Sequence, residues 1–384
     1  MKRKNMLLSI LLTALLTVGL LTGFVSPAPV EEAREQLSQL SDFIPANVPG
    51  FTGAVLVAQG ENILFADAFG MADPERGIET TVDTTFLIAS ISKSVTGAAI
   101  LILESEGKIS RSDTLDMFFT GHDDLAYVTI DHLLSMRGGF DLFSPRDVLG
   151  NINFTDLDNL ADFSYGFLIY TIASELAGET ETIMDAVLSL TPEVIEAHII
   201  ANWDGRTPRS FASSNADTYL LARIVSRASE MPFEDFVMSR IFESAGMTRS
   251  GFGGAHVEAV PSNEPFIVDG VDLNNAMNWP FSIAYGTGGF SSTVGDLNLF
   301  LDAYFGGRLF PEHMLDTIYN TTYNFGWSFI TNRIFRKGGY VGGLSSFVMY
   351  ERSSSTRIIF ITTTPYDVRV GRIVPEITRI LWGM

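Results

Sequence analysis

Ser90 and Lys93 form the first pair in this sequence that can do chemistry together. They begin a run of almost continuously apolar residues, 90–106, which predicts a buried helix. Residues three apart share one helix face, so the hydroxyl and the amine can meet. Burial lowers the pKa of an amine, and a neutral amine can take the serine proton and activate the hydroxyl as a nucleophile. The N-terminus of the helix would also direct backbone N–H groups toward developing negative charge.

Lysine is scarce in this chain, which gives each lysine more weight. Of 25 basic residues only five are lysines, and Lys2 and Lys4 belong to the N-terminal segment. Lys93, Lys108 and Lys337 remain. An arginine keeps its proton, whereas a buried lysine can lose it, so a lysine here suggests proton transfer; compositional bias is the alternative.

The same serine-lysine spacing occurs once more, at Ser105 and Lys108. Gly107 predicts a helix end between them, so their side chains should not share a helix face. We therefore interpret this second copy as solvated surface.

A second element is Ser213-Ser214-Asn215. Asn215 is the only asparagine in the chain with a serine or tyrosine two positions before it. It precedes a helix that we expect to begin near Tyr219. A serine-x-asparagine element can place a hydroxyl and an amide together, while the alternative is an ordinary helix cap or Asx turn.

A third element is Lys337-Gly338-Gly339, which follows a short strand predicted at 333–336. Paired glycines at the end of a strand allow another backbone to approach closely, so an extended substrate amide can add to this edge. The alternative is an ordinary turn at the end of a strand.

The three elements, called here the first, second and third boxes, stand far apart but in a meaningful order. S-x-x-K, then S-x-N, then K-G-G is the order of the motifs in serine β-lactamases and penicillin-binding proteins. The chain resembles that family from about residue 45 to its end, most of all the class C β-lactamase-related branch of esterases and D-amino-acid peptidases. The segments that carry the resemblance are FLIASISK (86–93), HLLSMRGG (132–139), GGFSSTVGDL (288–297) and KGGYVGGLSS (337–346).

The resemblance implies a role for each box. Ser90 is the expected nucleophile and Lys93 the base that activates it. Ser213, Asn215 and Lys337 are expected to move the proton and hold the substrate. Neither a metal nor an organic cofactor is implied.

The resemblance also implies an oxyanion hole, formed by the N–H groups of Ser90 and Tyr340, beside a substrate-binding edge at Gly338 and Gly339. In two places the chain differs from the family. The second box usually starts with tyrosine, where this chain has Ser213, and Gly338 supplies no hydroxyl. These differences favour an alternative function, a non-catalytic or slowly deacylating protein that binds penicillins or senses cell-wall peptides. Surface adhesion is a third, weaker alternative.

The N-terminal segment predicts export. Lys2, Arg3 and Lys4 precede an apolar run over residues 6–25, and Ser26-Pro27-Ala28 offers small residues before a cut. We expect residues 1–28 to be a cleaved signal peptide. The run is also long enough for an uncleaved anchor, which would be the only contact with a membrane.

The composition excludes several classes of protein. The 384 residues carry a net charge of −20, which argues against a nucleic-acid partner. Apolar residues make up 46% of the chain, enough for a large core. Cysteine is absent and the five histidines form no zincin motif, so cysteine nucleophiles and zincin sites are excluded. The expected partner is a small-molecule or peptide acyl substrate.

The predicted elements form an α+β fold. Strands are expected at 53–58 and 63–69, and again at 325–330, 333–336, 345–351 and 356–363. Between them the chain is mainly helical, with stretches at 166–176, 182–189, 219–229, 232–244 and 294–305. We expect the two groups of strands to join into one antiparallel sheet flanked by helices, including 31–42 and 367–382. Within one domain, 29–384, the sheet part covers about 45–85 and 320–384, and an inserted helical lobe covers about 90–300.

Overall fold

The computed structural model describes residues 29–140, 190–203, 205, 210–253, 257–259, 267–268, 271–272, 281–317, 323–331, 333–341, 343–364 and 370–383. The predicted signal peptide or anchor and the helices predicted at 166–176 and 182–189 lie outside these residues. Within the described ranges, no helix is both long and apolar enough to span a bilayer.

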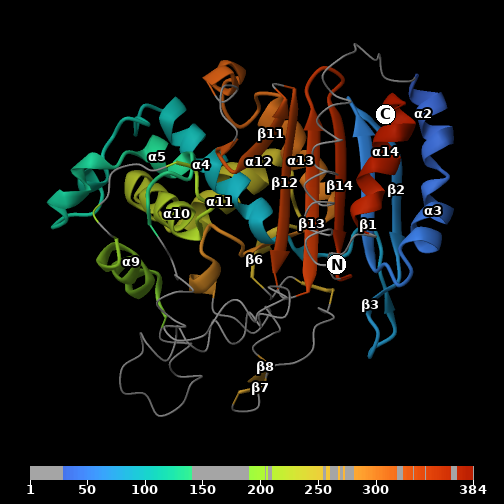
Figure 1. Cartoon of the computed structure of the whole chain (residues 1–384), viewed down its shortest axis with the longest axis horizontal. Helices are drawn as coiled ribbons and strands as arrows, with labels where there is room; N and C mark the ends of the chain where they lie inside the picture. Colours follow the sequence, from blue (N-terminus) through green and yellow to red (C-terminus); the bar gives the residue numbers. More distant parts are fainter. Residues whose placement is uncertain are drawn as a thin grey trace, which may run out of the picture.

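The described residues form one large antiparallel sheet from two distant parts of the chain (Figure 1). Its strand order is β10-β11-β12-β13-β14-β1-β2. The two parts meet where β1 pairs with β14, from Gly53 opposite Thr362 to Gln59 opposite Thr356. The predicted union of the two groups of strands is thus confirmed. The strands are β1 (Gly53–Gln59), β2 (Asn62–Phe69), β10 (Tyr323–Asn324), β11 (Trp327–Thr331), β12 (Ile334–Val341), β13 (Leu344–Glu351) and β14 (Thr356–Thr362).

Three helices at the two ends of the described chain cover one face of this sheet. They are α2 (Val30–Leu37), α3 (Leu40–Asn47) and α14 (Ile373–Trp382), and they enclose a separate apolar core with β1, β2 and β14 (Figure 1). The single helix predicted at 31–42 was wrong in extent. The chain turns at Ser38 and Gln39, and a second helix, α3, then runs to Asn47. The turn between the two helices aligns Leu40 and Ile44 with the core.

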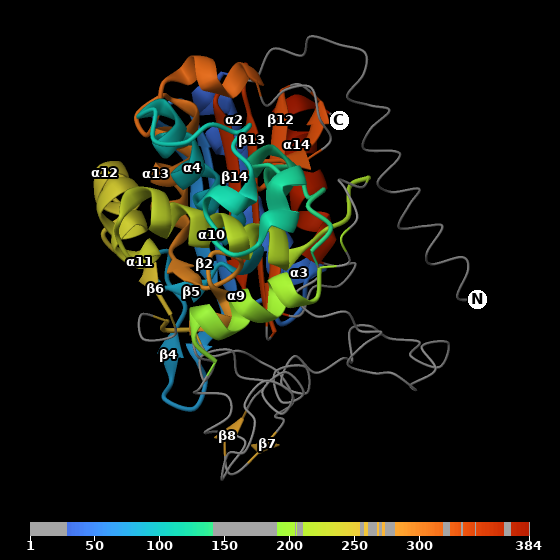
Figure 2. The same cartoon turned by 90° about the vertical axis from the view of Figure 1, so that its left-hand side faces the viewer.

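The opposite face carries the main core and the helical lobe, which Figure 2 presents in front of the sheet. The helix α4 (Ser92–Ser105) is buried almost all round, as its apolar run predicts. The helix α13 (Val294–Phe305) has the predicted bounds and packs against β14 and β1. It therefore belongs beside the sheet, although the sequence placed residues up to about 300 in the helical lobe.

The remaining described elements complete the lobe and its margins. The helix predicted at 232–244 is interrupted by a π-helical turn at Met238–Phe242. The helices are α5 (Ile130–Leu134), α9 (Pro192–Ala201), α10 (Asn215–Ser229), α11 (Phe233–Val237) and α12 (Glu243–Ala245), and the short strands are β3 (Met71–Asp73), β4 (Ile78–Glu79), β5 (Phe86–Leu87), β6 (Gly251–Phe252), β7 (Ile267–Val268), β8 (Val271–Asp272) and β9 (Phe290–Ser292).

Candidate active site

Ser90 and Lys93 are in direct contact. The Lys93 amine donates a hydrogen bond to the Ser90 hydroxyl at 2.8 Å and a second one to the carbonyl of Thr287 at 3.1 Å. Only 4% of Lys93 is exposed. This burial, together with the nearby charge of Lys337, holds the pKa of the Lys93 amine well below its usual value. The pair therefore has the geometry and the electrostatics of a serine activated by a neutral amine.

The turn that carries Ser90 is held in an uncommon backbone conformation. Ser90 lies in a short 3₁₀ turn just before α4, and Ala89 beside it has a φ of 46°. A non-glycine residue with positive φ costs energy and persists only where its surroundings fix it. The preceding residue, Ile88, fixes this turn through two hydrogen bonds. Its N–H donates to the Phe290 carbonyl at 2.9 Å, and its carbonyl accepts from the Ser346 hydroxyl at 2.7 Å.

The third box lies directly beside Ser90. A Cβ on Gly339 would come within 2.6 Å of the Ser90 nitrogen, so only glycine lets the two backbones approach this closely. The sequence had placed the glycines at the end of a short strand, which was wrong. The strand β12 runs through Lys337, Gly338 and Gly339 to Val341, because β13 pairs with it along its whole length.

One edge of β12 is open next to the serine. In the described part of the sheet, β11 pairs with β12 only as far as Ser328 opposite Arg336, so the stretch from Lys337 to Val341 has no strand on that side. Tyr340, the expected second oxyanion donor, lies on this stretch and is 40% exposed. An extended substrate backbone can pair with such an edge.

Lys337 points into a buried, aromatic environment. Its amine donates a hydrogen bond to the phenolic oxygen of Tyr323 at 3.1 Å and lies 4.9 Å from the centre of that ring. Burial lowers the pKa of Lys337 to about 8. The charge of Lys337 contributes to the lowered pKa of Lys93, so the Lys93 amine lies within reach of that charge.

The second box lies beside the same tyrosine but makes fewer contacts. The ring of Phe211 packs against that of Tyr323 at 5.4 Å between centres. Ser213 and Asn215 are exposed. Among the described residues, neither makes a side-chain hydrogen bond to the Ser90, Lys93 and Lys337 cluster. The structure thus brings the first and third boxes together and places the second at their margin.

The serine that caps α10 is Ser214, not Ser213. Its hydroxyl accepts from the Asp217 N–H at 3.2 Å and donates to the Phe140 carbonyl at 2.9 Å. The cap interpretation of this element therefore applies to its middle residue and leaves the other two side chains outside the cap.

A buried carboxyl lies beneath the second box. Asp217 is fully buried, and one of its oxygens accepts from the Gly138 N–H at 2.9 Å while the other has no hydrogen-bond partner among the described residues. Burial raises the pKa of Asp217 to about 8. Asp217 therefore ties α10 to the segment after α5 in its uncharged form over much of the physiological range.

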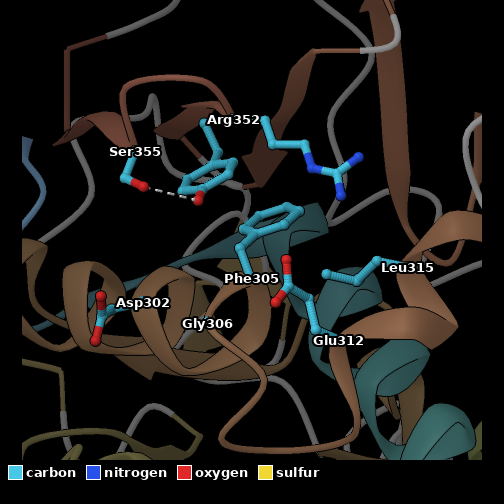
Figure 3. A pocket seen from close by; sticks show the side chains of 8 residues that line it. Asp302, Phe305, Gly306, Glu312, Leu315, Arg352 and Ser355 are labelled. Carbon is cyan, nitrogen blue, oxygen red and sulfur yellow. Dashed lines mark hydrogen bonds between the residues drawn. The ribbon is translucent and has the colours of Figure 1, made fainter.

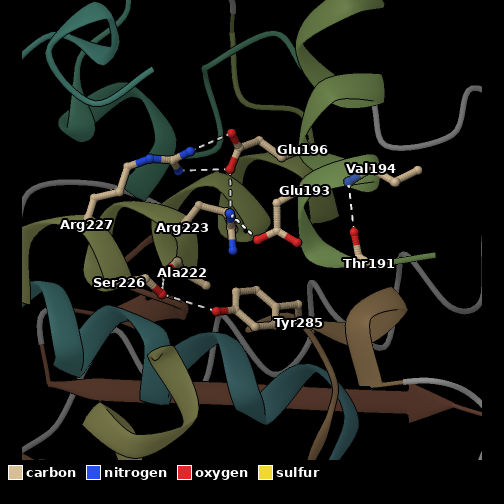
Figure 4. A network of polar contacts seen from close by, with 9 residues as sticks. All are labelled: Thr191, Glu193, Val194, Glu196, Ala222, Arg223, Ser226, Arg227 and Tyr285. Atoms are coloured by element: carbon tan, nitrogen blue, oxygen red, sulfur yellow. Dashed lines mark hydrogen bonds and ion pairs between the residues drawn. The ribbon is translucent and has the colours of Figure 1, made fainter. Parts of the chain in front are cut away.

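An ion network joins α9 to α10 and to the segment that contacts Lys93 (Figure 4). Glu196 on α9 binds Arg223 at 2.6 Å and Arg227 through both of its oxygens. One turn away, Ser226 bonds the hydroxyl of Tyr285 at 3.1 Å. Tyr285 stands two residues before Thr287, whose carbonyl receives the Lys93 amine, so this network supports the site from the lobe side.

The second serine-lysine pair behaves as surface. The Ser105 hydroxyl donates to the carbonyl of Ile102 at 2.7 Å, and the exposed Lys108 pairs with Glu106 at 3.5 Å. Neither side chain joins the cluster around Ser90.

A separate cavity of about 280 Å³ contains none of the predicted site residues. It lies where α13 meets the far ends of β13 and β14, over the stacked rings of Phe305 and Tyr350, and Arg352 and Glu312 point toward it (Figure 3). In the parts of the chain that the structure describes, no group of three or more histidine, aspartate or glutamate side chains is placed to hold a metal.

Sequence reasoning missed three contributors to this site: Thr287, Asp217 and Tyr323. Thr287 acts through its carbonyl, which any residue supplies. Asp217 follows the second box by two residues, but nothing in its type predicts burial. Tyr323 lies just before a two-residue turn at Phe325-Gly326, which the strand predicted at 325–330 crossed, because Phe-Gly is not a residue pair typical of such turns.

Comparison with known proteins places this geometry in a family. The family model for beta-lactamase matches residues 46–376. The chain belongs to the beta-lactamase family. The resemblance to serine β-lactamases and penicillin-binding proteins is thereby confirmed, and so is the α+β fold class. The family includes serine hydrolases, which accords with the activated serine of the first box.

Relatives of this beta-lactamase family member carry different names. A Bacillus subtilis (strain 168) protein named penicillin-binding protein PbpX is 23% identical over 86% of this chain and 75% of its own length. Esterase EstB from Burkholderia gladioli is 26% identical, but the match covers 55% of this chain and only 50% of EstB. The solved D-amino acid amidase from Ochrobactrum anthropi SV3 superposes with a TM-score of 0.67 at 19% identity, covering 90% of this chain and 98% of the amidase chain. Its likeness supports the fold.

Proposed function

We propose that this protein is an exported serine hydrolase that acts through an acyl-enzyme on an ester, a D-amino-acid peptide or a β-lactam. The observation that carries the proposal is the 2.8 Å contact between the Lys93 amine and the Ser90 hydroxyl, made by a lysine whose pKa burial lowers. The names of the relatives, an esterase, an amidase and penicillin-binding proteins, support the same range of acyl substrates.

The proposed reaction begins with transfer of the Ser90 proton to the neutral Lys93 amine as the serine oxygen bonds to the substrate carbonyl carbon. The N–H groups of Ser90 and Tyr340 would stabilise the negative charge on the carbonyl oxygen. The bond to the leaving group then breaks, and the leaving group receives the proton held by Lys93. Water hydrolyses the ester on Ser90, which releases the acid and restores the hydroxyl.

Substrate would lie along the open edge of β12. The charged Lys337 amine stands next to this edge and suits a carbonyl or carboxylate oxygen of the substrate. Gly338 leaves free space where a hydroxyl-bearing residue is often found in the family. The exposed Ser213 and Asn215 form the opposite margin.

Intact-mass measurement after incubation with three probes tests the proposal. The probes are p-nitrophenyl acetate, a D-alanyl-D-alanine peptide and benzylpenicillin. We expect at least one to add its acyl mass to the wild-type chain and none to add it to Ser90→Ala. Ser105→Ala is the matched control, because Ser105 begins the other serine-lysine pair, and it should be labelled like wild type. Equal labelling of Ser90→Ala would overturn the assignment of the nucleophile.

A second function, slow release or plain binding of the acyl group, is favoured by Ser213 and Gly338. Ser213 supplies only a short hydroxyl where the resembled branch usually has a phenol, and Gly338 supplies no hydroxyl at all. A non-catalytic binder would retain a β-lactam without a covalent mass change, whereas a slowly deacylating protein would stay labelled for a long time. The same mass experiment, followed over hours, separates these outcomes from rapid turnover.

The export part of the proposal rests on residues 2–28 alone. The basic start and the apolar run over 6–25 suit a signal peptide or an anchor. Cell fractionation with N-terminal sequencing of the mature protein tests it. A start near residue 29 in the extracellular or periplasmic fraction supports cleavage, and a full-length chain in the cytoplasm contradicts export.

A further inference from the structure

Lys337, the lysine of the third box, contacts a tyrosine from outside the three boxes. Tyr323 lies on β10, fourteen residues before Lys337, and is only 6% exposed. Its phenolic oxygen accepts the Lys337 hydrogen bond at 3.1 Å, and the ammonium also faces the ring at 4.9 Å from its centre. Both contacts favour the charged form of the lysine.

The hairpin that carries Tyr323 rests on the helix that carries Lys93. Phe325 and Gly326 form the two-residue turn of this hairpin, with φ angles of 49° and 84°. A Cβ on Gly326 would come within 2.5 Å of the Lys93 carbonyl, and the Ser94 hydroxyl donates to the Gly326 carbonyl at 3.2 Å. The same turn thus fixes Tyr323 relative to the first turn of α4.

Positive φ at a buried phenylalanine is costly, since only glycine, asparagine and aspartate adopt it readily. Phe325 is fully buried, and its N–H is held by the Asn324 side chain at 3.0 Å. The ring of Phe325 belongs to the main hydrophobic core, so its packing offsets the cost of this backbone conformation and anchors the hairpin that carries Tyr323.

We propose that Tyr323 is a positioning residue that holds the Lys337 ammonium beside Ser90 and keeps it charged at neutral pH. The inference rests on the proposed function insofar as it concerns the reaction. Among the described residues, the titratable groups that face the Tyr323–Lys337 pair are Lys93 on α4 and Asp217 on α10. The residue opposite Lys337 on β13 is the apolar Val348.

The variant Tyr323→Phe removes the hydroxyl and keeps the ring that packs on Phe211. Tyr350→Phe is the matched control. Tyr350 is also 6% exposed and lies in the same sheet, and its hydroxyl donates to Ser355 in the separate cavity, away from Lys337. The two variants lose the same atom from equally buried tyrosines, so they separate a general packing effect from an effect on Lys337.

The test is an NMR titration of protein labelled with ¹³C at the lysine ε-carbon, in which Lys337→Arg assigns the signal. The mature chain has few lysines, so the spectrum is simple. We expect a Lys337 pKa of about 8 in wild type. In Tyr323→Phe it should fall by about one unit, because a hydrogen bond to a charged group is lost, and in Tyr350→Phe it should stay. An unchanged Lys337 pKa in Tyr323→Phe overturns the proposal whether or not the protein is an enzyme.

A second measurement connects the contact to the reaction. The rate of Ser90 acylation by p-nitrophenyl acetate is followed against pH in the same variants. The alkaline limb should move to lower pH by the same amount in Tyr323→Phe alone. A shifted Lys337 pKa without a shifted limb would contradict the role in the reaction. Failure of wild type to acylate with any of the three probes would overturn the proposed function, and the titration would still decide the contact.

Discussion

A side chain on Gly339 would place its Cβ 2.6 Å from the backbone nitrogen of Ser90, closer than packed atoms can stand. The neighbouring Gly338 differs, because among the described residues a Cβ there would meet just the Ser346 carbonyl oxygen, at 3.7 Å, which is an ordinary contact. Two adjacent glycines of the third box therefore have different reasons for being glycine. Gly339 is required by the close approach of the Ser90 backbone, whereas a methyl group at Gly338 would fit without displacing its neighbours.

We predict that Gly339→Ala lowers the rate of Ser90 acylation by about 100-fold or more. The added methyl group would displace the Ser90 N–H from the oxyanion position, and one lost oxyanion donor costs about 10²–10³ in rate. Gly338→Ala should stay within a few-fold of wild type. Time-resolved intact mass measures both, and circular dichroism checks that both fold. Equal rates in the two variants would contradict the close approach of β12 to Ser90.

Lys93→Arg should abolish most of the acylation, because it replaces an amine that can be neutral with a permanent positive charge. Arginine keeps its proton in proteins, so the serine would lose its base, and positioned proton transfer contributes about 10²–10⁴ to the rate. Lys108→Arg, at the surface pair, should leave the rate unchanged. A Lys93→Arg variant that retains wild-type acylation would show that a charged partner suffices.

The pH dependence of acylation should have two limbs. Lys93 must be neutral to accept a proton, so the rate rises with pH as this lysine, with its lowered pKa, loses its proton. Lys337 must be charged to hold the substrate, and its pKa of about 8 predicts a fall in rate above that pH. Lys337→Arg keeps its charge and should remove the alkaline limb, even if its maximal rate is lower. If the alkaline limb persists in Lys337→Arg, it must arise from the titration of another group.

The sequence predicted the sheet because its strands alternate or run apolar over short stretches between turn residues. It missed features that depend on tertiary packing. Residues 31–47 form two helices because their apolar side chains must align with a core that includes α14. The strand β12 extends past its glycines because β13 supplies hydrogen bonds that the local sequence does not reveal.

Within the site, the three-residue spacing predicted the Ser90–Lys93 contact, although α4 begins only at Ser92 and Ser90 lies in the 3₁₀ turn before it. The position of Lys337 near the first box could be predicted only from the order of the three boxes along the chain. Nothing local could predict that Tyr323 would face Lys337, because a hairpin and a strand contribute one residue each and their register decides the contact. The exposed positions of Ser213 and Asn215 likewise depend on Ser214 taking the cap.

The buried Asp217 should make the protein less stable as pH rises. Its pKa of about 8 in the folded state lies above the value of 3.8 for an ordinary aspartate, so between these values the unfolded chain releases a proton that the folded chain keeps. Stability from this group is complete below about pH 4 and is lost as pH rises toward 8. The melting temperature of Asp217→Asn, minus that of wild type, should therefore increase as pH rises from about 4 to 8.

The control for this prediction is Asp42→Asn, an exposed position on α3. It should follow the pH dependence of wild type. Only the trend of the difference in melting temperature matters, because the amide also changes the hydrogen bond to Gly138. A constant difference between Asp217→Asn and wild type from pH 4 to 8 would contradict the buried, protonated carboxyl.

Ser213 leads to the last prediction, a burst of acylation followed by slow turnover. Acylation needs mainly Ser90, Lys93 and the oxyanion donors, whereas release of the acyl group needs a well-placed group to activate water, and Ser213 is a short hydroxyl on an exposed segment. Because this position is open, Ser213→Tyr can add a phenol there and should raise the steady rate, with Ser210→Tyr as the control on the same segment. Stopped-flow release of p-nitrophenol measures burst and steady phases separately. A linear trace at a high steady rate in wild type would mean that Ser213 already transfers the proton efficiently.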